Sequence, residues 1–160
     1  MKAQNKNGTI EVHQGIPNSF SSSLGTVLGG GSTMSDEDAK AHGFFDVVLP
    51  DSYDERIHNL SDIFFVSAEQ IYTYTKTNKT WSESLVELKA NKIANLKSQA
   101  NRLLEPTDWY IIRKVELETA IPSSVTTARA TIKTNVDTKE SEINALTSKA
   151  NVVVYGINLE

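Results

Sequence analysis

The spacing of apolar residues changes near Trp81. Before this point, short apolar segments alternate with polar residues and are separated by turn-forming residues, which is typical of strands. After it, apolar residues recur every three or four positions, as they do on one face of a helix. The pattern predicts an α+β fold: a small antiparallel sheet in the N-terminal half, followed by a long-helix hairpin or bundle.

The first half contains several short segments that favour strands. Ile71 and Thr73 alternate with Tyr72 and Tyr74, and these β-branched and aromatic residues suit the two faces of a pleated strand. Because the segments follow one another closely, we expect them to form an antiparallel meander. The candidate strands are residues 9–13, 44–49, 53–60, 62–66 and 70–75.

Two non-strand segments lie between the first two candidates. Residues 19–35 are rich in serine and glycine, so their backbone is costly to order, and we expect a loop or a tether that is ordered only against a partner. Ser35 can cap a short helix, with acidic residues following in its first turn, and Gly43 can end it.

The second half predicts three helices and a last strand. A helix of about 20 residues starts near Ser82 and stops at Pro106, and a second starts at Thr107 or Asp108. Residues 123–148 favour a long third helix that packs against the first, and residues 152–155 favour a closing strand. The apolar stripes are Val86, Ile93, Leu96, Ala100 and Leu103 in the first helix and Val125, Ile132, Val136, Ile143 and Leu146 in the third.

These patterns divide the chain into four segments. They are an N-terminal strand with its tether (1–34), a small β-rich module (35–80), a helical module (81–150) and a C-terminal strand (151–160). Since the ends carry few core candidates, we expect that deletion of 1–34 or 151–160 leaves the central fold intact and weakens assembly.

Composition excludes some classes of function. The 160 residues carry 16 basic and 20 acidic side chains, a net charge of -4, which disfavours nucleic-acid binding. No apolar run approaches the roughly 20 residues that span a bilayer, so we expect no membrane insertion, and no signal peptide is visible. The absence of cysteine removes disulfides, thiolate metal sites and cysteine nucleophiles.

No motif predicts catalysis or a cofactor. Residues 25–32 resemble a phosphate-binding loop, but Gly31 stands where that loop needs its lysine. His13, His42 and His58 lack the spacing that places two metal ligands on one helical face. We therefore expect neither an enzyme nor a bound cofactor or metal.

The segment from Leu103 to Glu116 is the most informative. Pro106 breaks a helix there, and we expect a packed helical corner in which Trp109 is buried and Arg113 pairs with Glu116 one turn later. On this reading, Trp109→Ala costs about 3–5 kcal/mol, as other aromatic core truncations do.

This segment also resembles a known family. Residues 104–110, followed by Arg113, Glu116, Ile121-Pro122 and Arg129, are similar to the helical part of tailed-bacteriophage tail-fibre assembly and tail-fibre-associated proteins. Residues 35–45 are similar to their acidic helix, which ends in His-Gly-aromatic and leads into an apolar strand. The resemblance covers roughly residues 35–146.

The resemblance implies a non-enzymatic structural component of a phage tail, attached to or decorating a tail fibre or baseplate. The alternatives are a tail-fibre assembly chaperone that is not retained in the virion, and a small ligand-binding domain or enzyme. The implied partners are tail-fibre or baseplate proteins, in a homo-oligomer or hetero-assembly. The implied location is the virion, after synthesis in the bacterial cytoplasm. The candidate interface residues are Trp109, Tyr110, Arg113, Ile132, Val136, Ile143, Val152 and Val154.

Overall fold

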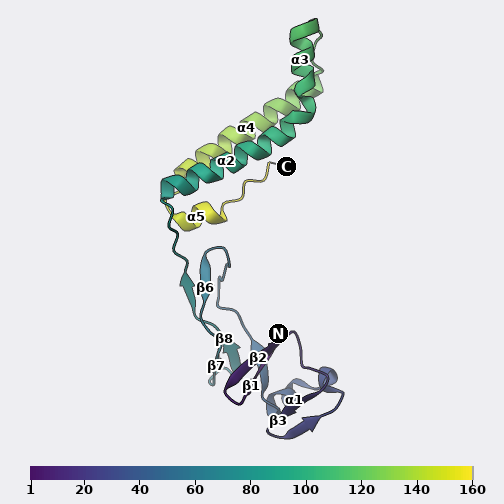
Figure 1. Ribbon diagram of the computed structural model, residues 1–160, viewed down its shortest axis with the longest axis vertical. Helices are drawn as coiled ribbons and strands as arrows, with labels where there is room; N and C mark the ends of the chain where they lie inside the picture. Colours follow the sequence, from purple (N-terminus) through teal and green to yellow (C-terminus); the bar gives the residue numbers. More distant parts are fainter. Residues whose placement is uncertain (160) are drawn as a thin grey trace. The chain divides into compact units, whose positions relative to one another are not determined.

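The computed structural model describes residues 1–159 and divides the chain into two compact units. The first unit, residues 1–79, contains all the strands together with one short helix, and the second begins at Thr80 and contains the long helices (Figure 1). The α+β class is therefore confirmed, with sheets in the N-terminal half and long helices after them.

A five-stranded mixed sheet organises the first unit. Its strand order is β2-β1-β5-β8-β7. All neighbouring strands are antiparallel except β5 and β8, which are parallel, with Val47 opposite Tyr72. The strands are β1 (Lys2–Lys6), β2 (Thr9–His13), β5 (Phe44–Val47), β7 (Phe64–Val66) and β8 (Ile71–Thr73).

The expected meander is therefore wrong in two places. The sequence pattern missed β1, whose Lys-Ala-Gln-Asn-Lys composition is unlike a strand, although it pairs with both β2 and β5. Of the expected strand 53–60, only β6 (His58–Leu60) forms, and it pairs with β9 (Lys76–Asn78) in a separate two-stranded sheet. Sequential strands are not all spatial neighbours, because β5 pairs with β8 rather than with β6.

Alternation along β5 gives the five-stranded sheet two packed faces. Val47 lies on one face with Ala3 and Tyr72, and these three residues form a buried cluster. Phe44, which is fully buried, lies on the other face, where helix α1 (Asp36–Ala41) contacts β5. The predicted start of α1 is confirmed, since the Ser35 side chain accepts a hydrogen bond from the Asp38 N–H.

The serine- and glycine-rich segment is a folded hairpin rather than a tether. Strands β3 (Phe20–Ser22) and β4 (Gly25–Val27) pair antiparallel, and a short 3-10 helix, η1 (Gly31–Thr33), follows. Phe20 packs edge-on against Phe44 at 4.7 Å between ring centroids. Gly31 is buried, and a Cβ there would lie 2.1 Å from the carbonyl oxygen of Pro17. Close packing, rather than flexibility, thus requires this glycine.

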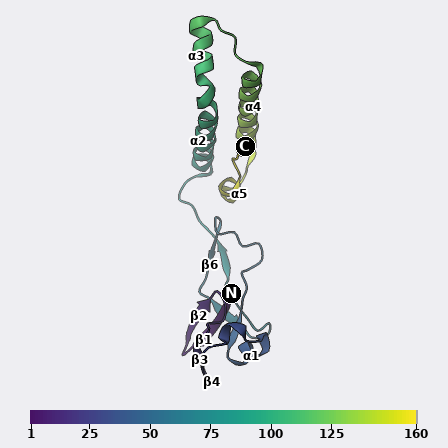
Figure 2. The same cartoon turned by 90° about the vertical axis from the view of Figure 1, so that its right-hand side faces the viewer.

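The second unit is built on two antiparallel helices, α2 (Leu85–Leu104) and α4 (Ser123–Ala145), which lie side by side in Figures 1 and 2. A capping box of Ser84 and Glu87 starts α2. The predicted packing of the two helices is confirmed, and most of their stripe residues line the core, but Val86 is 75% exposed and Leu103 36%. The buried core is Leu96, Ala100, Ile143 and Leu159, with Ile93, Ile132, Val136, Tyr155 and Ile157 against it.

Pro106 ends the first helix and a second helix starts at Asp108, as expected. Pro106 lies in a 3-10 turn, η2 (Glu105–Thr107), and α3 (Asp108–Leu117) follows it at an angle to α2 (Figure 1). The expected packing of this corner is wrong, because no residue of α3 is buried. Proline is tolerated there because it occupies the first turn of a new helical segment, where its missing N–H matters little. The chain turns back only after α3, and Glu118, with a φ of 54°, ends that helix.

The C-terminal segment is a helix rather than the expected strand. Ser148 caps α5 (Lys149–Val154) by accepting a hydrogen bond from the Asn151 N–H, and Val152 is almost fully buried. Four lysine ammonium groups donate to carbonyl oxygens of this unit: Lys89 to Asn144, Lys92 to Val153, Lys139 to Gly156 and Lys149 to Trp81.

Both ends of the chain contribute to the cores of their units. Ala3 in β1 is fully buried, and Val152 and Leu159 are buried in the second unit. The expectation that 1–34 or 151–160 can be deleted without harm to the fold therefore conflicts with the structure, because each deletion removes core residues.

Candidate functional site

Helix α3 is the most exposed apolar element of the second unit. None of its residues is buried, and it packs mainly against the preceding turn η2. The far end of α3 extends past the start of α4 (Figure 2). Large apolar side chains that are exposed together on one surface are typical of an interaction site. Their exposed fractions are 48% for Trp109, 39% for Ile111, 56% for Ile112, 78% for Val115 and 70% for Leu117.

Helical geometry places four of these residues on one broad arc. At 3.6 residues per turn, Ile111, Val115, Ile112 and Trp109 follow one another around less than half of the circumference. Glu116 lies within the same arc and has no hydrogen-bond or ion-pair partner among the described residues. We call these five residues the α3 face.

Trp109, Tyr110 and Arg113 form an aromatic and cationic cluster at the edge of the α3 face. The Arg113 guanidinium carbon lies 4.7 Å from the Trp109 ring centroid and 5.4 Å from that of Tyr110. The expected burial of Trp109 is wrong, and Arg113 stacks on the rings instead of pairing with Glu116. Its Nε is buried without a hydrogen-bond partner, so the cluster is held by cation–π contact.

Arg129 of α4 joins the end of α2 to the start of α3. Its guanidinium NH1 donates to the Leu104 carbonyl oxygen at 2.9 Å and to the Thr107 hydroxyl at 2.6 Å. The same nitrogen lies 2.8 Å from a carboxylate oxygen of Asp108, and only 14% of the Arg129 side chain is exposed. We call Leu104, Thr107, Asp108 and Arg129 the α2–α3 joint.

The remaining predicted interface residues lie closer to the core. Ile143 and Val152 are buried, so they support the fold of this unit rather than a free surface. Ile132 and Val136 are partly buried between α2 and α4, and Val154 is half-buried at the end of α5. The structure thus brings Trp109, Tyr110 and Arg113 together on α3, whereas three of the other five residues lie on α4 and two on α5.

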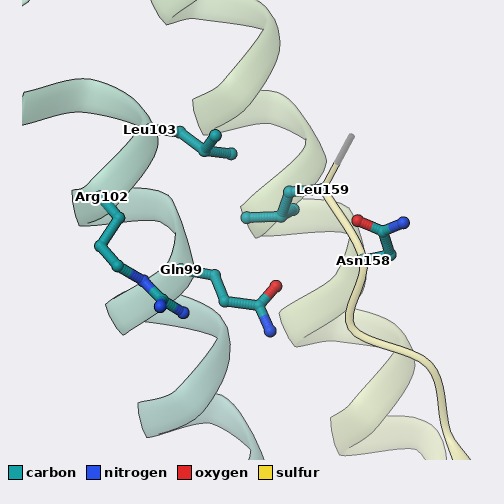
Figure 3. A pocket seen from close by; sticks show the side chains of 5 residues that line it. All are labelled: Gln99, Arg102, Leu103, Asn158 and Leu159. Carbon is teal, nitrogen blue, oxygen red and sulfur yellow. The ribbon is translucent and has the colours of Figure 1, made fainter. Parts of the chain in front are cut away.

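Two concave surfaces lie apart from the α3 face. A groove of about 430 Å³ lies between α2 and the C-terminal segment, where Leu103 and Leu159 approach each other and Gln99 and Arg102 line one wall (Figure 3). A cleft of about 390 Å³ in the first unit is lined by amide and hydroxyl side chains from β1 and β3, together with His42.

The cleft contains a serine–histidine pair, which sequence reasoning did not find. The Ser22 hydroxyl lies 2.8 Å from His42 Nδ1, but it also accepts a hydrogen bond from the Leu24 N–H within its own turn. Among residues 1–159, no carboxylate contacts His42 to orient it, as a catalytic base would require. The pair therefore ties the β3–β4 turn to the end of α1. Among residues 1–159, no group of three or more histidine and carboxylate side chains could hold a metal ion.

Comparison of the chain with protein-family models, curated proteins and solved structures gave no match. Within the described residues, no helix has both the length and the apolar character to cross a bilayer. The α3 face and the α2–α3 joint are therefore the features of the second unit that bear on its function.

Proposed function

We propose that this protein is a non-enzymatic structural component of a bacteriophage tail, which attaches to or decorates a tail fibre or baseplate through the α3 face. The observation that carries the proposal is the exposure of four large apolar side chains on α3, a helix of which no residue is buried. A side chain such as Ile112 gains about 1.5–3 kcal/mol when it is fully buried, so a partner that covers this face gains several such contributions.

The chemistry of the face specifies its occupant. The partner needs an apolar groove or helix face that accepts Ile111, Ile112 and Val115. It also needs a basic side chain at the rim to meet Glu116, which has no ion-pair partner within residues 1–159. Complementary charge of this kind selects the partner and fixes its register. A fibre or baseplate chain with these features is the proposed occupant.

The resemblance to tail-fibre-associated proteins supports the same surface. The quoted residues Thr107, Asp108 and Arg129 meet at the α2–α3 joint, and Trp109, Tyr110 and Arg113 form the cluster beside it. A pattern that is dispersed in sequence thus falls within one region of the second unit. On this proposal, the residues of the pattern form one exposed helix, α3, and fix its position.

The first test is the copy number of the protein in purified virions of the phage that encodes it. A structural component is present in a fixed ratio to the fibre or baseplate proteins. Absence from virions, together with a requirement for fibre folding, would contradict the proposal and favour the assembly chaperone.

The second test isolates the α3 face with a matched pair of variants. Val115 is 78% exposed on α3 and Val86 is 75% exposed on α2, so the same change at both should alter stability equally little. We expect Val115→Ser to weaken incorporation into the tail about tenfold, because one buried valine is lost from the contact, and Val86→Ser to leave it unchanged. Equal effects of the two variants would contradict a role for the α3 face. Self-association of the purified protein, abolished by Val115→Ser alone, would instead make a second copy the occupant.

A further inference from the structure

The α2–α3 joint leaves one backbone carbonyl without its ordinary helical donor. In an uninterrupted α-helix, the Asp108 N–H would bond to the Leu104 carbonyl oxygen four residues earlier. The 3-10 turn at Pro106 instead directs the Asp108 N–H to the Glu105 oxygen. The Leu104 oxygen accepts two side-chain donors in its place, the Thr107 hydroxyl at 2.8 Å and Arg129 NH1 at 2.9 Å.

Arg129 thereby contacts both sides of the break. On the α2 side it meets Leu104 at the negative end of the helix dipole, and on the α3 side it meets Asp108 in the first turn. Both contacts involve the charged Arg129 guanidinium, and hydrogen bonds to a charged group are stronger than those between neutral groups. The Arg129 side chain is only 14% exposed, whereas that of Asp108 is 55% exposed. An arginine suits this place because its planar fork presents several donors in a fixed geometry.

Apolar packing does little to hold α3 in place. No residue of α3 is buried, and the helix packs mainly against η2. The direction in which α3 leaves α2 is therefore set by the backbone of the turn and by the polar contacts that brace it.

We propose that Arg129 is a positioning residue that, through Leu104, Thr107 and Asp108, holds α3 in a fixed direction and so presents the α3 face to its partner. The claim that α3 is presented to a partner rests on the proposed function. The claim that Arg129 holds α3 in a fixed direction does not rest on it, and the two claims are tested separately.

The first experiment measures amide hydrogen exchange in the full-length protein. Arg129→Met keeps the length of the side chain and removes its donors, and Lys97→Met is the control, because it removes the exposed 3.0 Å ion pair between Lys97 and Glu140. We expect Arg129→Met to accelerate exchange in residues 108–117 by roughly 10- to 100-fold, the loss expected for hydrogen bonds to a charged group. Exchange in residues 93–100 should stay as in the parent, and Lys97→Met should change neither region.

A second set of variants keeps the test decisive if Arg129→Met does not fold. Thr107→Val removes one partner of Arg129 without a change in shape, and Thr107→Ser restores the hydroxyl. We expect faster exchange in residues 108–117 for Thr107→Val and parent-like exchange for Thr107→Ser. Unchanged exchange in α3 for the variants that fold would overturn the proposal, as would equal acceleration in α2, α3 and α4, which would indicate a general loss of stability.

The second experiment measures incorporation of the same variants into the tail. If Arg129 positions the α3 face, the variants with faster exchange in α3 incorporate less well than Lys97→Met. A different result separates the two parts of the proposal. If the Arg129 and Thr107 variants show faster exchange in α3, but these variants and Val115→Ser are all incorporated into the tail as well as the parent, Arg129 still orders α3 and the proposed function fails. If exchange in α3 is unchanged, the positioning role fails whatever the result for incorporation.

Discussion

At the scale of single residues, side chains of similar chemistry have different structural roles in this protein. Leu96 is fully buried in the core of the second unit, whereas Trp109, a larger apolar residue, is 48% exposed on α3. Ser35, Ser84 and Ser148 each cap a helix, while Ser22 ties a turn to His42. Exposure and partners, rather than residue type, therefore decide what a substitution does.

Trp109→Ala is expected to lower the free energy of unfolding by only about 1–2 kcal/mol, since about half of the Trp109 side chain is already in water. Leu96→Ala, which opens a cavity in the core, is expected to cost about 2–5 kcal/mol. Urea unfolding of both variants checks the difference. An equal or larger loss for Trp109→Ala would restore the interpretation of Trp109 as a core anchor.

The Tyr155 hydroxyl predicts a dependence of stability on alkaline pH. Burial and the hydrogen bond to the Glu142 carboxylate raise the pKa of Tyr155 to about 12 from its ordinary value near 10. Because the folded-state pKa is the higher one, the stabilising contribution is complete below pH 10 and is lost as the pH rises through 12. The unfolding free energy of the parent should fall more between pH 10 and 12 than that of Tyr155→Phe. Parallel pH profiles for the two proteins would rule this contribution out.

At the scale of elements, the sequence pattern found most helices and misjudged several strands. The capping residues at Ser35 and Ser84 and the stripe through Leu96 mark helices by local rules that packing did not override. Strand β1 was not predicted because its mostly polar sequence shows no alternation of apolar and polar residues. Its place between β2 and β5 also depends on pairing with residues far along the chain. The four residues 152–155 were too few to distinguish a buried helix from a strand by apolar character alone.

The candidate site was predictable only in part. The residues of the aromatic cluster are near one another in sequence, so their grouping could be inferred, but their exposure could not. Burial of Trp109 was expected from a packed corner at Pro106. The helix does break there, but no residue of α3 is buried and Trp109 is 48% exposed. The contact of Arg129 with Leu104, 25 positions earlier, depends on the antiparallel register of α2 and α4, which no local pattern encodes.

Helix α5 offers a test at the same scale. Ser148→Ala removes the side-chain acceptor for the Asn151 N–H and is expected to cost about 1 kcal/mol, the usual contribution of an N-cap. Ser148→Asp keeps an acceptor at the same position and should retain most of the stability. Chemical denaturation of the second unit measures both changes. No loss in Ser148→Ala would argue against a capped helix at this end.

At the scale of the whole molecule, the chain consists of two units, each with its own core. The buried cluster of Ala3, Val47 and Tyr72 belongs entirely to the first unit, and that of Leu96, Ala100, Ile143 and Leu159 to the second. Separate cores of this kind can fold separately.

We expect residues 1–79 and 80–160, produced as separate proteins, each to unfold in a cooperative thermal transition at the temperature seen for that unit in the full chain. Calorimetry of the full chain and of both pieces provides the comparison. A piece that is unfolded alone, or whose transition shifts strongly, would show that the two units depend on each other.

Removal of residues 1–34 or 151–160 should instead abolish cooperative unfolding of the affected unit, because each removal takes away core residues.

The lysine–carbonyl contacts of the second unit have a consequence for chemical reactivity. An ammonium group that donates to a backbone oxygen must leave that oxygen before it can lose a proton and attack an acylating reagent. The amines of Lys89, Lys92, Lys139 and Lys149 are engaged in this way, whereas Lys114 and Lys133 have no such partner among the described residues. Amine acylation should therefore modify Lys114 and Lys133 first. The acylation rates of Lys92 and Lys139, whose acceptors are Val153 and Gly156, then report how often the C-terminal segment separates from α2 and α4.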